Sequence, residues 1–410
     1  MLEMRKMKDS GIEWIGEIPE GWEVVQLKRF AEVHNGREID VEVDSTDSSA
    51  VGVYGSGGVF KYTNRSQYSG KAVLFGRKGT LGKPLYVEGQ LWAVDTMYFL
   101  TYSNRLLEKF SYYQFLAFNW APYITHTAIP SVVASEIVAC YFPIPPLEEQ
   151  AKIADYLDNG CASLDTILDK TRSSIEEYKE LKQAVITQAV TKGVRGEQEM
   201  KDSGVEWIGE IPKEWVCEKI KYATSISRGL FNHRPRNDER YYNGKYPFIQ
   251  TGDVANATKY IVSYSQTLNE LGKSVSKEFP KGTLTMTIAA NVGDVAILNF
   301  DAYFPDSIVG FIPNKNIRTL YLFYVFSAMK DEFTRTAIKS TQFNLNIDRV
   351  KETFIPVTLN VNEQCEIENY LESKCAEIDG LIAKKEQLVK ELESYKKSLI
   401  YEVVTGKREV

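Results

Sequence analysis

The chain has 410 residues, of which 43% are hydrophobic, 12% aromatic and 25% charged, which predicts a globular protein with room for two or three domains. Its formal net charge of -6 excludes the strongly basic overall composition of many nucleic-acid-binding proteins. No run of 18 apolar residues occurs in the sequence, which excludes a membrane-spanning helix of ordinary length.

Compartment and cofactor chemistry follow from the first residues and from the cysteines and histidines. The opening segment MLEMRKMKDSGIEWIG has no apolar core of signal-peptide length, so we expect a cytoplasmic protein with no membrane partner. The five cysteines form no CxxC pair, and we expect them to be buried free thiols. The three histidines are isolated, without the ligand spacing of a zinc site. No metal or other cofactor is therefore expected in this chain.

The first element along the chain is a boundary motif, MKDSGIEWIGEIPEGW, which ends at Trp22. It returns as MKDSGVEWIGEIPKEW, which ends at Trp215, an offset of 215 minus 22, or 193. Self-similarity at a fixed offset indicates an internal repeat.

A mixed region follows each boundary motif. In the first, KAVLF and PLYV flank GRKGTLG, and in the second TLTMTI and VAILN flank AANVGD, so each predicts a β-hairpin with a glycine-shaped tip. Most of the extra length of the second region comes from SRGLFNHRPRNDERYYNGK, which begins at Ser227. Aromatic residues at helical spacing in LEKFSYYQFLAF and RTLYLFYVFSAMKDEF predict core helices, with an aromatic ligand cage as the alternative.

A long amphipathic helix closes each repeat, over residues 148–193 and 359–410. Glu149-Gln150 aligns with Glu363-Gln364 at an offset of 214. The predicted apolar seams are Ile153, Leu157, Cys161, Leu164, Leu168, Ile175, Tyr178, Leu181 and Val185, and Ile367, Leu371, Cys375, Ile378, Ile382, Val389, Leu392, Leu399 and Val403. The fold class is therefore α+β with a pseudo-two-fold repeat: mixed domains at 1–147 and 194–358, and two spacer helices, each roughly 65 Å long, that form an antiparallel coiled coil.

Catalytic motifs are missing from the sequence. It contains no GxxxxGK[ST] loop, no glycine-rich dinucleotide turn, no NPPY-type tetrapeptide, and no HExxH or GxSxG motif. Asp306 follows Pro305, but no acidic-x-lysine pair follows soon after, so this dipeptide is a weak indication of a nuclease. The sequence therefore predicts a non-catalytic protein that binds a partner.

Positive charge is concentrated on the mixed domains. Residues 61–109 carry eight basic against three acidic side chains, and residues 216–358 carry eighteen against thirteen, whereas both helices are acidic. Basic side chains that lie beside glycine, asparagine and tyrosine suit phosphate binding and the reading of base edges. An ordinary solvated basic face remains the alternative. The candidate DNA-binding residues are Arg65, Arg77, Lys78, Thr80, Lys83, Arg228, Asn232, Arg234, Arg236, Asn291, Lys339, Gln342 and Asn344.

The repeated SGIEWIGEIPEGW and SGVEWIGEIPKEW, the helix entry PIPPLEEQAKIADYLD, and the exits TKG and TGK resemble the specificity subunit of a Type I restriction-modification enzyme. The resemblance covers nearly the whole chain, and it departs from the family where VTLNVNEQ replaces the proline-rich helix entry. It implies that the mixed domains are target-recognition domains for double-stranded DNA, paired on an antiparallel helical spacer.

The resemblance also implies partners. Two modification (methyltransferase) subunits would bring S-adenosylmethionine, and restriction (translocase/endonuclease) subunits would add ATP and magnesium chemistry. Because GRKGTLG and AANVGD differ, we expect an asymmetric site in two halves. Two other hypotheses remain: a cytosolic coiled-coil adaptor with two protein-binding heads, which the acidic helices would suit, and a DNA binder that acts without modification subunits.

Overall fold

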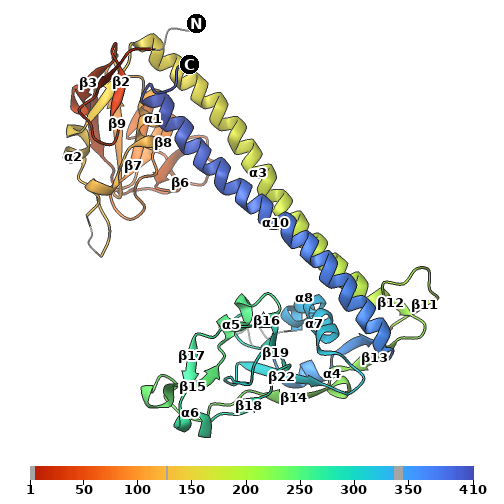
Figure 1. Ribbon diagram of the computed structural model, residues 1–410. Helices are drawn as coiled ribbons and strands as arrows, with labels where there is room; N and C mark the ends of the chain where they lie inside the picture. The colour runs from red at the N-terminus through yellow and green to blue at the C-terminus, as the bar shows by residue number, and fades with distance from the viewer. Residues whose placement is uncertain (1–4, 126–127, 337–344) are drawn as a thin grey trace. The chain divides into compact units, whose positions relative to one another are not determined.

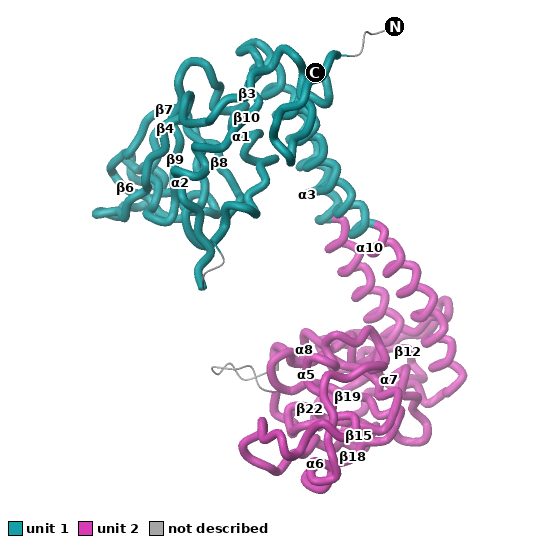
Figure 2. Tube along the Cα trace, turned by 60° about the vertical axis from the view of Figure 1, so that its left-hand side comes forward, with its two compact units in different colours: residues 1–173, 385–410 teal, residues 174–384 magenta. Residues whose placement is uncertain are grey.

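The computed structural model describes residues 5–125, 128–336 and 345–410 (Figure 1). Two compact units make up the chain, one from residues 1–173 with 385–410 and the other from residues 174–384 (Figure 2). Each unit contains one mixed domain and one half of each long helix. The predicted domain limits, which divide the chain by repeat, stay a prediction.

The mixed domain of the first unit is built on a six-stranded sheet in the order β4-β9-β7-β8-β5-β6. These strands are β4 (Ala31–Asn35), β5 (Val51–Gly55), β6 (Gly58–Thr63), β7 (Tyr68–Gly76), β8 (Leu85–Ala93) and β9 (Met97–Tyr102). The predicted hairpin is confirmed, because β7 and β8 pair antiparallel with Leu74 opposite Leu85. The helix α1 (Glu108–Ala117) covers one face, where Phe110 and Phe115 pack with Phe75. Short elements complete the domain: η1 (Leu27–Arg29), η2 (Ala121–Tyr123), α2 (Ala134–Ala139), and the pair β3 (Glu23–Gln26) and β10 (Tyr141–Ile144).

The mixed domain of the second unit is built on two larger sheets, ordered β14-β22-β19-β20-β16 and β17-β15-β21-β18. They are β14 (Thr224–Arg228), β15 (Tyr242–Phe248), β16 (Tyr260–Ile261), β17 (Gln266–Leu268), β18 (Glu278–Phe279), β19 (Leu284–Thr287), β20 (Val295–Leu298), β21 (Ala302–Tyr303) and β22 (Ile308–Pro313). The second predicted hairpin is β19 with β20. The remaining elements are α4 (Ile220–Ala223), η3 (Glu239–Tyr241), α5 (Thr251–Asn256), α6 (Glu270–Ser274), α7 (Thr319–Ala328), α8 (Lys330–Thr336), α9 (Ile347–Glu352), and the pair β13 (Val216–Lys219) and β23 (Phe354–Val357).

The predicted aromatic segments form the helices α1 and α7, and their rings lie in the core. On α7, Tyr321, Leu322, Val325 and Phe326 are fully buried, so packing and not a ligand cage explains the aromatic spacing. All five cysteines are free thiols, but only Cys161 and Cys375 are buried within the described residues, and the other three are half-buried. Among the described helices, none combines the length and apolar composition needed to cross a bilayer.

The long helices are α3 (Leu147–Lys192) and α10 (Val361–Val404), and they run antiparallel within each unit. In the second unit the Lys182 Nζ lies 2.7 Å from Asp379, and in the first unit the Lys396 Nζ lies 2.6 Å from Asp165. Both partners of one pair are offset by 214 residues from those of the other, so the two ion pairs repeat the same contact. The internal repeat is therefore confirmed, while supercoiling of the pair stays a prediction.

The apolar seam of α3 is largely as predicted, with one correction. Ile153, Leu157 and Leu168 are buried, but Leu181 is 48% exposed. Residues that face the partner helix follow one another at intervals of three or four. After Tyr178 the interval is four, so Lys182 and not Leu181 faces the partner helix. The lysine stem covers apolar surface there while its ammonium group reaches Asp379.

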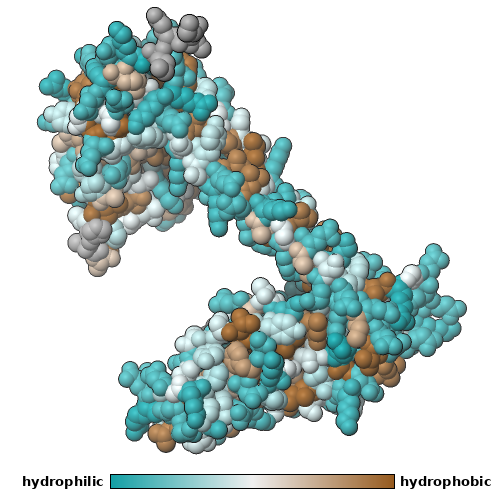
Figure 3. All heavy atoms as spheres, viewed as in Figure 1, coloured by the Kyte–Doolittle hydropathy of each residue, from teal (hydrophilic) through white to brown (hydrophobic). Residues whose placement is uncertain are grey.

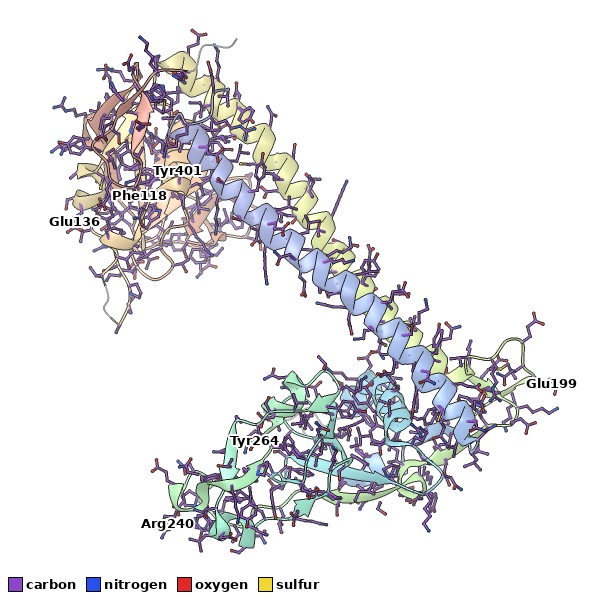
Figure 4. All side chains as sticks on the ribbon, viewed as in Figure 1. Phe118, Glu136, Glu199, Arg240, Tyr264 and Tyr401 are labelled. Carbon is purple, nitrogen blue, oxygen red and sulfur yellow. The ribbon has the colours of Figure 1, made fainter. Side chains whose placement is uncertain are left out.

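Each boundary motif packs against the end of a long helix. The first contains the strands β1 (Met7–Asp9) and β2 (Glu17–Pro19), and the second contains β11 (Met200–Asp202) and β12 (Glu210–Pro212). In the first unit the Tyr401 hydroxyl, near the end of α10, donates to the Trp14 carbonyl at 3.0 Å (Figure 4). In the second unit Trp215 lies in one core cluster with Val190 near the end of α3. In the first unit, the boundary motif near the N-terminus is therefore hydrogen-bonded to the last turns of α10.

A buried glutamine joins each mixed domain to its helix. The Gln150 side chain accepts from the Leu107 N–H at 2.8 Å and donates to the carbonyls of Arg105 and Pro145. Gln364 repeats this pattern in the second unit, with the Arg318 N–H and the carbonyls of Asn316 and Thr358. Both glutamine side chains are fully buried, and in each unit the bond to the carbonyl just before the helix, Pro145 or Thr358, is buried as well.

A tyrosine and a carboxylate form a second joint in each unit. The Tyr113 hydroxyl donates to Asp158 at 2.5 Å, and the Tyr324 hydroxyl donates to Glu372. Burial, followed by these hydrogen bonds, raises the pKa of both phenols, which keeps them protonated donors over the physiological range.

Replacing the buried glutamine should loosen the first unit. We expect Gln150→Ala to lower the free energy of unfolding by about 2–3 kcal/mol, because buried backbone groups lose their partners. Gln188→Ala, at an exposed position of the same helix, should change it by less than about 0.5 kcal/mol. Urea titration of both variants measures the difference, and equal stabilities would contradict the anchoring role.

Candidate nucleic-acid interface

The connections at one edge of the first sheet converge on a set of loops, which we call the first loop cluster (residues 36–37, 76–83, 94–96 and 128–132). The Arg37 N–H bonds to the Ala93 carbonyl, the Arg77 N–H to Thr96, and the Gly79 N–H to Pro130. Gly36 allows this approach, because a Cβ there would lie 1.8 Å from the Val94 carbonyl oxygen. Segments far apart in the sequence thus form one surface.

Basic and polar side chains project from this cluster. Lys78, Thr80 and Lys83 are exposed on the hairpin tip between β7 and β8. Arg77 is half-buried, and its guanidinium lies 5.7 Å from the centre of the Tyr98 ring. The tip therefore combines a stacked arginine, held in place by its own domain, with two solvated lysines.

The second unit repeats the arrangement in its second loop cluster (residues 229–241, 288–293 and 304–307). The Gly229 N–H bonds to Ile308, Leu230 to Phe304, and Ile288 to Ser307, at the offsets of 193 and 211 that relate the two repeats. A Cβ on Gly229 would lie 2.2 Å from the Pro305 carbonyl oxygen. The same backbone frame therefore carries two different sets of loops.

Arginines of the long insertion meet at Asp306. The Arg228 Nε donates to the Asp306 carbonyl at 2.5 Å, Arg236 Nη2 pairs with Asp306 Oδ1, and Arg234 Nη2 lies 3.8 Å from Oδ2. Arg234 also donates from Nη1 to the carbonyls of Phe231 and His233. Two guanidinium groups at the carboxylate and a third at the backbone carbonyl of the same residue leave an excess of positive charge around Asp306.

The base of the insertion is held by aromatic packing and a hydrogen bond. Phe231 is 3% exposed and stacks with Tyr242, and the Tyr242 hydroxyl donates to the Arg236 carbonyl. Burial raises the pKa of Tyr242, so its hydroxyl stays a donor. Further along, the Arg240 guanidinium holds the pKa of the Asp238 carboxyl well below its ordinary value.

The structure brings together most of the predicted residues that it describes, but not all. Arg77, Lys78, Thr80 and Lys83 share the first loop cluster, and Arg228, Asn232, Arg234, Arg236 and Asn291 belong to the second or lie at its edge. Arg65 lies instead between β6 and β7, where Nη1 is 3.4 Å from Asp40. Lys339, Gln342 and Asn344 lie outside the described residues.

Two residues of these surfaces were not among the sequence-based candidates. Arg37 is exposed in the first cluster, and the alignment of NGR with RGL at an offset of 193 was a signal for it. Asp306 had been considered only as part of a nuclease motif. Its contacts assign it a structural place between arginines.

The hairpin tips differ at one strained position. Gly79 has φ of 82°, whereas the residue at the matching place, Ala290, has φ of 63°. A left-handed backbone disfavours any residue with a Cβ. The next left-handed position is glycine in both tips, Gly82 and Gly293.

The fold and the two loop clusters define a binding protein with two related but non-identical sites, each on a mixed domain that packs against both long helices. The model of the Type I restriction modification DNA specificity domain matches residues 19–177 and 226–391. The chain therefore belongs to the family of Type I restriction-modification DNA specificity subunits, which are non-catalytic and recognise the DNA sequence.

Similar proteins agree with this assignment. The chain is 25% identical over 430 residues to the Type I restriction enzyme MjaVIII specificity subunit of Methanocaldococcus jannaschii, covering 95% of this chain and 93% of the relative. It is 29% identical over 169 residues to the MjaIX specificity subunit of the same organism, covering 40% of this chain and 38% of the relative.

A solved structure shares the fold. It comes from a study of complex assembly and conformational transition in a Type I restriction-modification system, and it matches with a TM-score of 0.74 at 16% identity. The match covers 95% of this chain and 99% of the other. The pairing of two mixed domains with two long helices is thus shared at low sequence identity.

Relieving the strain at Ala290 should stabilise the second hairpin. We expect Ala290→Gly to raise the free energy of unfolding by about 0.5–1 kcal/mol, because glycine adopts the left-handed backbone without a steric cost. Ala289→Gly, one residue earlier, should lower it by a similar amount through added entropy of the unfolded chain. Thermal unfolding measures both, and a stabilising Ala289→Gly with a destabilising Ala290→Gly would refute the explanation.

Proposed function

We propose that each loop cluster reads one half of a bipartite, asymmetric site on double-stranded DNA, with one half-site on each strand. The observation that supports this most strongly is the repeat of one backbone frame with different side chains. At the two tips, Lys78 and Thr80 of the first correspond to Ala289 and Asn291 of the second. Because base edges are read by side chains, different tips read different sequences.

The candidate residues fall into two groups by their surroundings. Lys78 and Lys83 are solvated point charges that suit phosphate contacts, which position the protein on the duplex. The arginines around Asp306 have fixed planes and suit contacts with base edges. We assign Arg65 a phosphate contact outside the first cluster.

The helices offer a repeated surface for partners. Apolar side chains are exposed on α3 at Tyr156, Ile167 and Leu181, and on α10 at Tyr370 and Tyr395. Tyr156 with Tyr370, and Leu181 with Tyr395, are related by the offset of 214, and Figure 3 shows hydrophobic residues on the visible face of the helices. A surface that occurs twice suits two copies of one partner.

We therefore propose that two modification (methyltransferase) subunits bind the helices and supply S-adenosylmethionine, and that restriction (translocase/endonuclease) subunits add the ATP- and magnesium-dependent steps. The complex would work in the cytoplasm. This chain would contribute sequence recognition and a scaffold, and no catalytic group.

Methylation mapping tests the proposal. The chain mixed with its modification subunit and S-adenosylmethionine should methylate adenine in a two-part, non-palindromic sequence, read out by sequencing of the modified DNA. The chain alone should leave DNA unmodified. A single continuous palindrome, or no methylation by an intact assembled complex, would contradict the proposal, and the latter result would favour an adaptor with two protein-binding heads.

Charge removal at the first tip should weaken binding without changing which sequence is preferred. We expect Lys78→Ala to weaken binding to all sequences alike and to reduce the salt dependence by about one ion, as for a phosphate contact. Lys71→Ala is the matched control, because Lys71 lies on strand β7 of the same hairpin, away from the tip, and its Nζ is 3.9 Å from Glu88. Fluorescence anisotropy at several salt concentrations measures the slope, and unchanged binding of Lys78→Ala in the assembled complex would refute the contact.

A further inference from the structure

We propose that Arg236 and Asp306 act together as the reader of a single G·C base pair in the half-site of the second mixed domain. The proposal rests on the proposed function, since it assumes that the second loop cluster meets DNA. It specifies which base pair this surface selects and which two side chains select it.

The two side chains match the major-groove edge of a G·C pair. Guanine presents two acceptors, O6 and N7, and cytosine presents one donor, the N4 amino group. Arg236 contacts Asp306 through one hydrogen of Nη2, and a guanidinium has five donors, so the edge formed by Nη1 and the second Nη2 hydrogen remains for guanine. An ionised carboxylate accepts several hydrogen bonds, so Asp306 can take the cytosine amino group while it holds Arg236.

Exposure and anchoring favour base reading at this place. The side chains of Arg236 and Asp306 are 44% and 34% exposed, so both are accessible to a ligand while the rest of each side chain is covered by the protein. Asp306 lies on the short connection between β21 and β22, and its carbonyl is held by Arg228. Neighbouring Ser307 bonds to Ile288 at the base of the hairpin tip. A preorganised donor and acceptor lose little conformational entropy on binding.

The carboxylate argues against a pure phosphate clamp. A negative group beside the arginines would repel a phosphate, whereas a base pair that carries both donors and acceptors needs both charges. Arg234 supports the pair from the other side, with Nη2 at 3.8 Å from Oδ2 and Nη1 bound to backbone carbonyls. It therefore positions the insertion, while Arg236 holds the carboxylate through Nη2 and keeps donors available for a base.

The matching carboxylate in the first unit is Asp95, at an offset of 211 from Asp306. The segment that faces it there is the shorter NGREID, and the arginine-rich insertion occurs only in the second unit. The pair of side chains that reads G·C is therefore expected in the second mixed domain and not in the first.

The test is a methylation selection on a randomised DNA library by the complete complex of this chain with its modification subunits. Wild type should require G·C at one position of the second half-site. Arg236→Ala and Asp306→Ala should each relax that same position by roughly 5- to 100-fold and leave the other positions unchanged. The double variant should be little worse than either single variant, because the two residues act as a unit.

Two further variants separate base reading from charge and from folding. Arg236→Lys keeps the charge but loses the planar fork, so it should keep the salt dependence and lose the discrimination. Arg240→Ala removes an arginine of the same insertion that pairs with Asp238 and not with Asp306, so it should retain the G·C requirement. In Figure 4 this side chain is labelled at the insertion. Thermal unfolding of each variant checks that the fold is intact.

The outcomes are distinct. Equal loss on every sequence, with a smaller salt slope, would identify a phosphate contact and overturn the G·C reader. An unchanged preference in Arg236→Ala and Asp306→Ala would overturn it as well. Failure of the wild-type complex to methylate any two-part site would instead contradict the proposed function itself.

Discussion

The antiparallel register of α3 and α10 is the constraint on which the rest of the molecule depends. The paired contacts of Lys182 with Asp379 and of Lys396 with Asp165 are half-exposed, and such ion pairs contribute at most about 1 kcal/mol each. Most of the stabilisation therefore comes from the buried apolar seam, and the ion pairs add one matching contact in each unit. Because the same contacts recur at an offset of 214, each unit receives one helix start and one helix end, and its mixed domain is built against both.

Two buried glutamines on the long helices fix the mixed domains to them through hydrogen bonds. Gln150 and Gln364 satisfy backbone groups that would otherwise be buried without partners, which makes the joint costly to break. Beyond the joint, Gly36 and Gly229 allow loops to pack at distances that no larger residue permits. The frame is thus the same in both units, and the variation is confined to loops, where insertions are tolerated and recognition residues are commonly found.

Charge is divided in the same way. Both long helices are acidic, whereas residues 61–109 and 216–358 of the mixed domains carry an excess of basic side chains, so the electrostatic field favours a polyanion at these parts over the helices. This division explains how a chain with a net charge of -6 belongs to a DNA-recognising family. It also shows that overall charge is a poor guide where opposite charges are segregated.

The sequence by itself determined the repeat, the two helices, both hairpins and the buried aromatic helices, because each depends on local spacing that a single segment carries. Even there, the place of Leu181 was wrong, since the inward face of a long helix depends on its partner as well as on its own period. Tertiary structure alone decided which loops meet. Arg236 and Asp306 are 70 residues apart and come together only through the order and register of strands, whereas Arg65, similar in sequence context, is placed beside Asp40. A side chain's residue type is local information, but its neighbours across a sheet are fixed by strand pairing, which no single segment encodes.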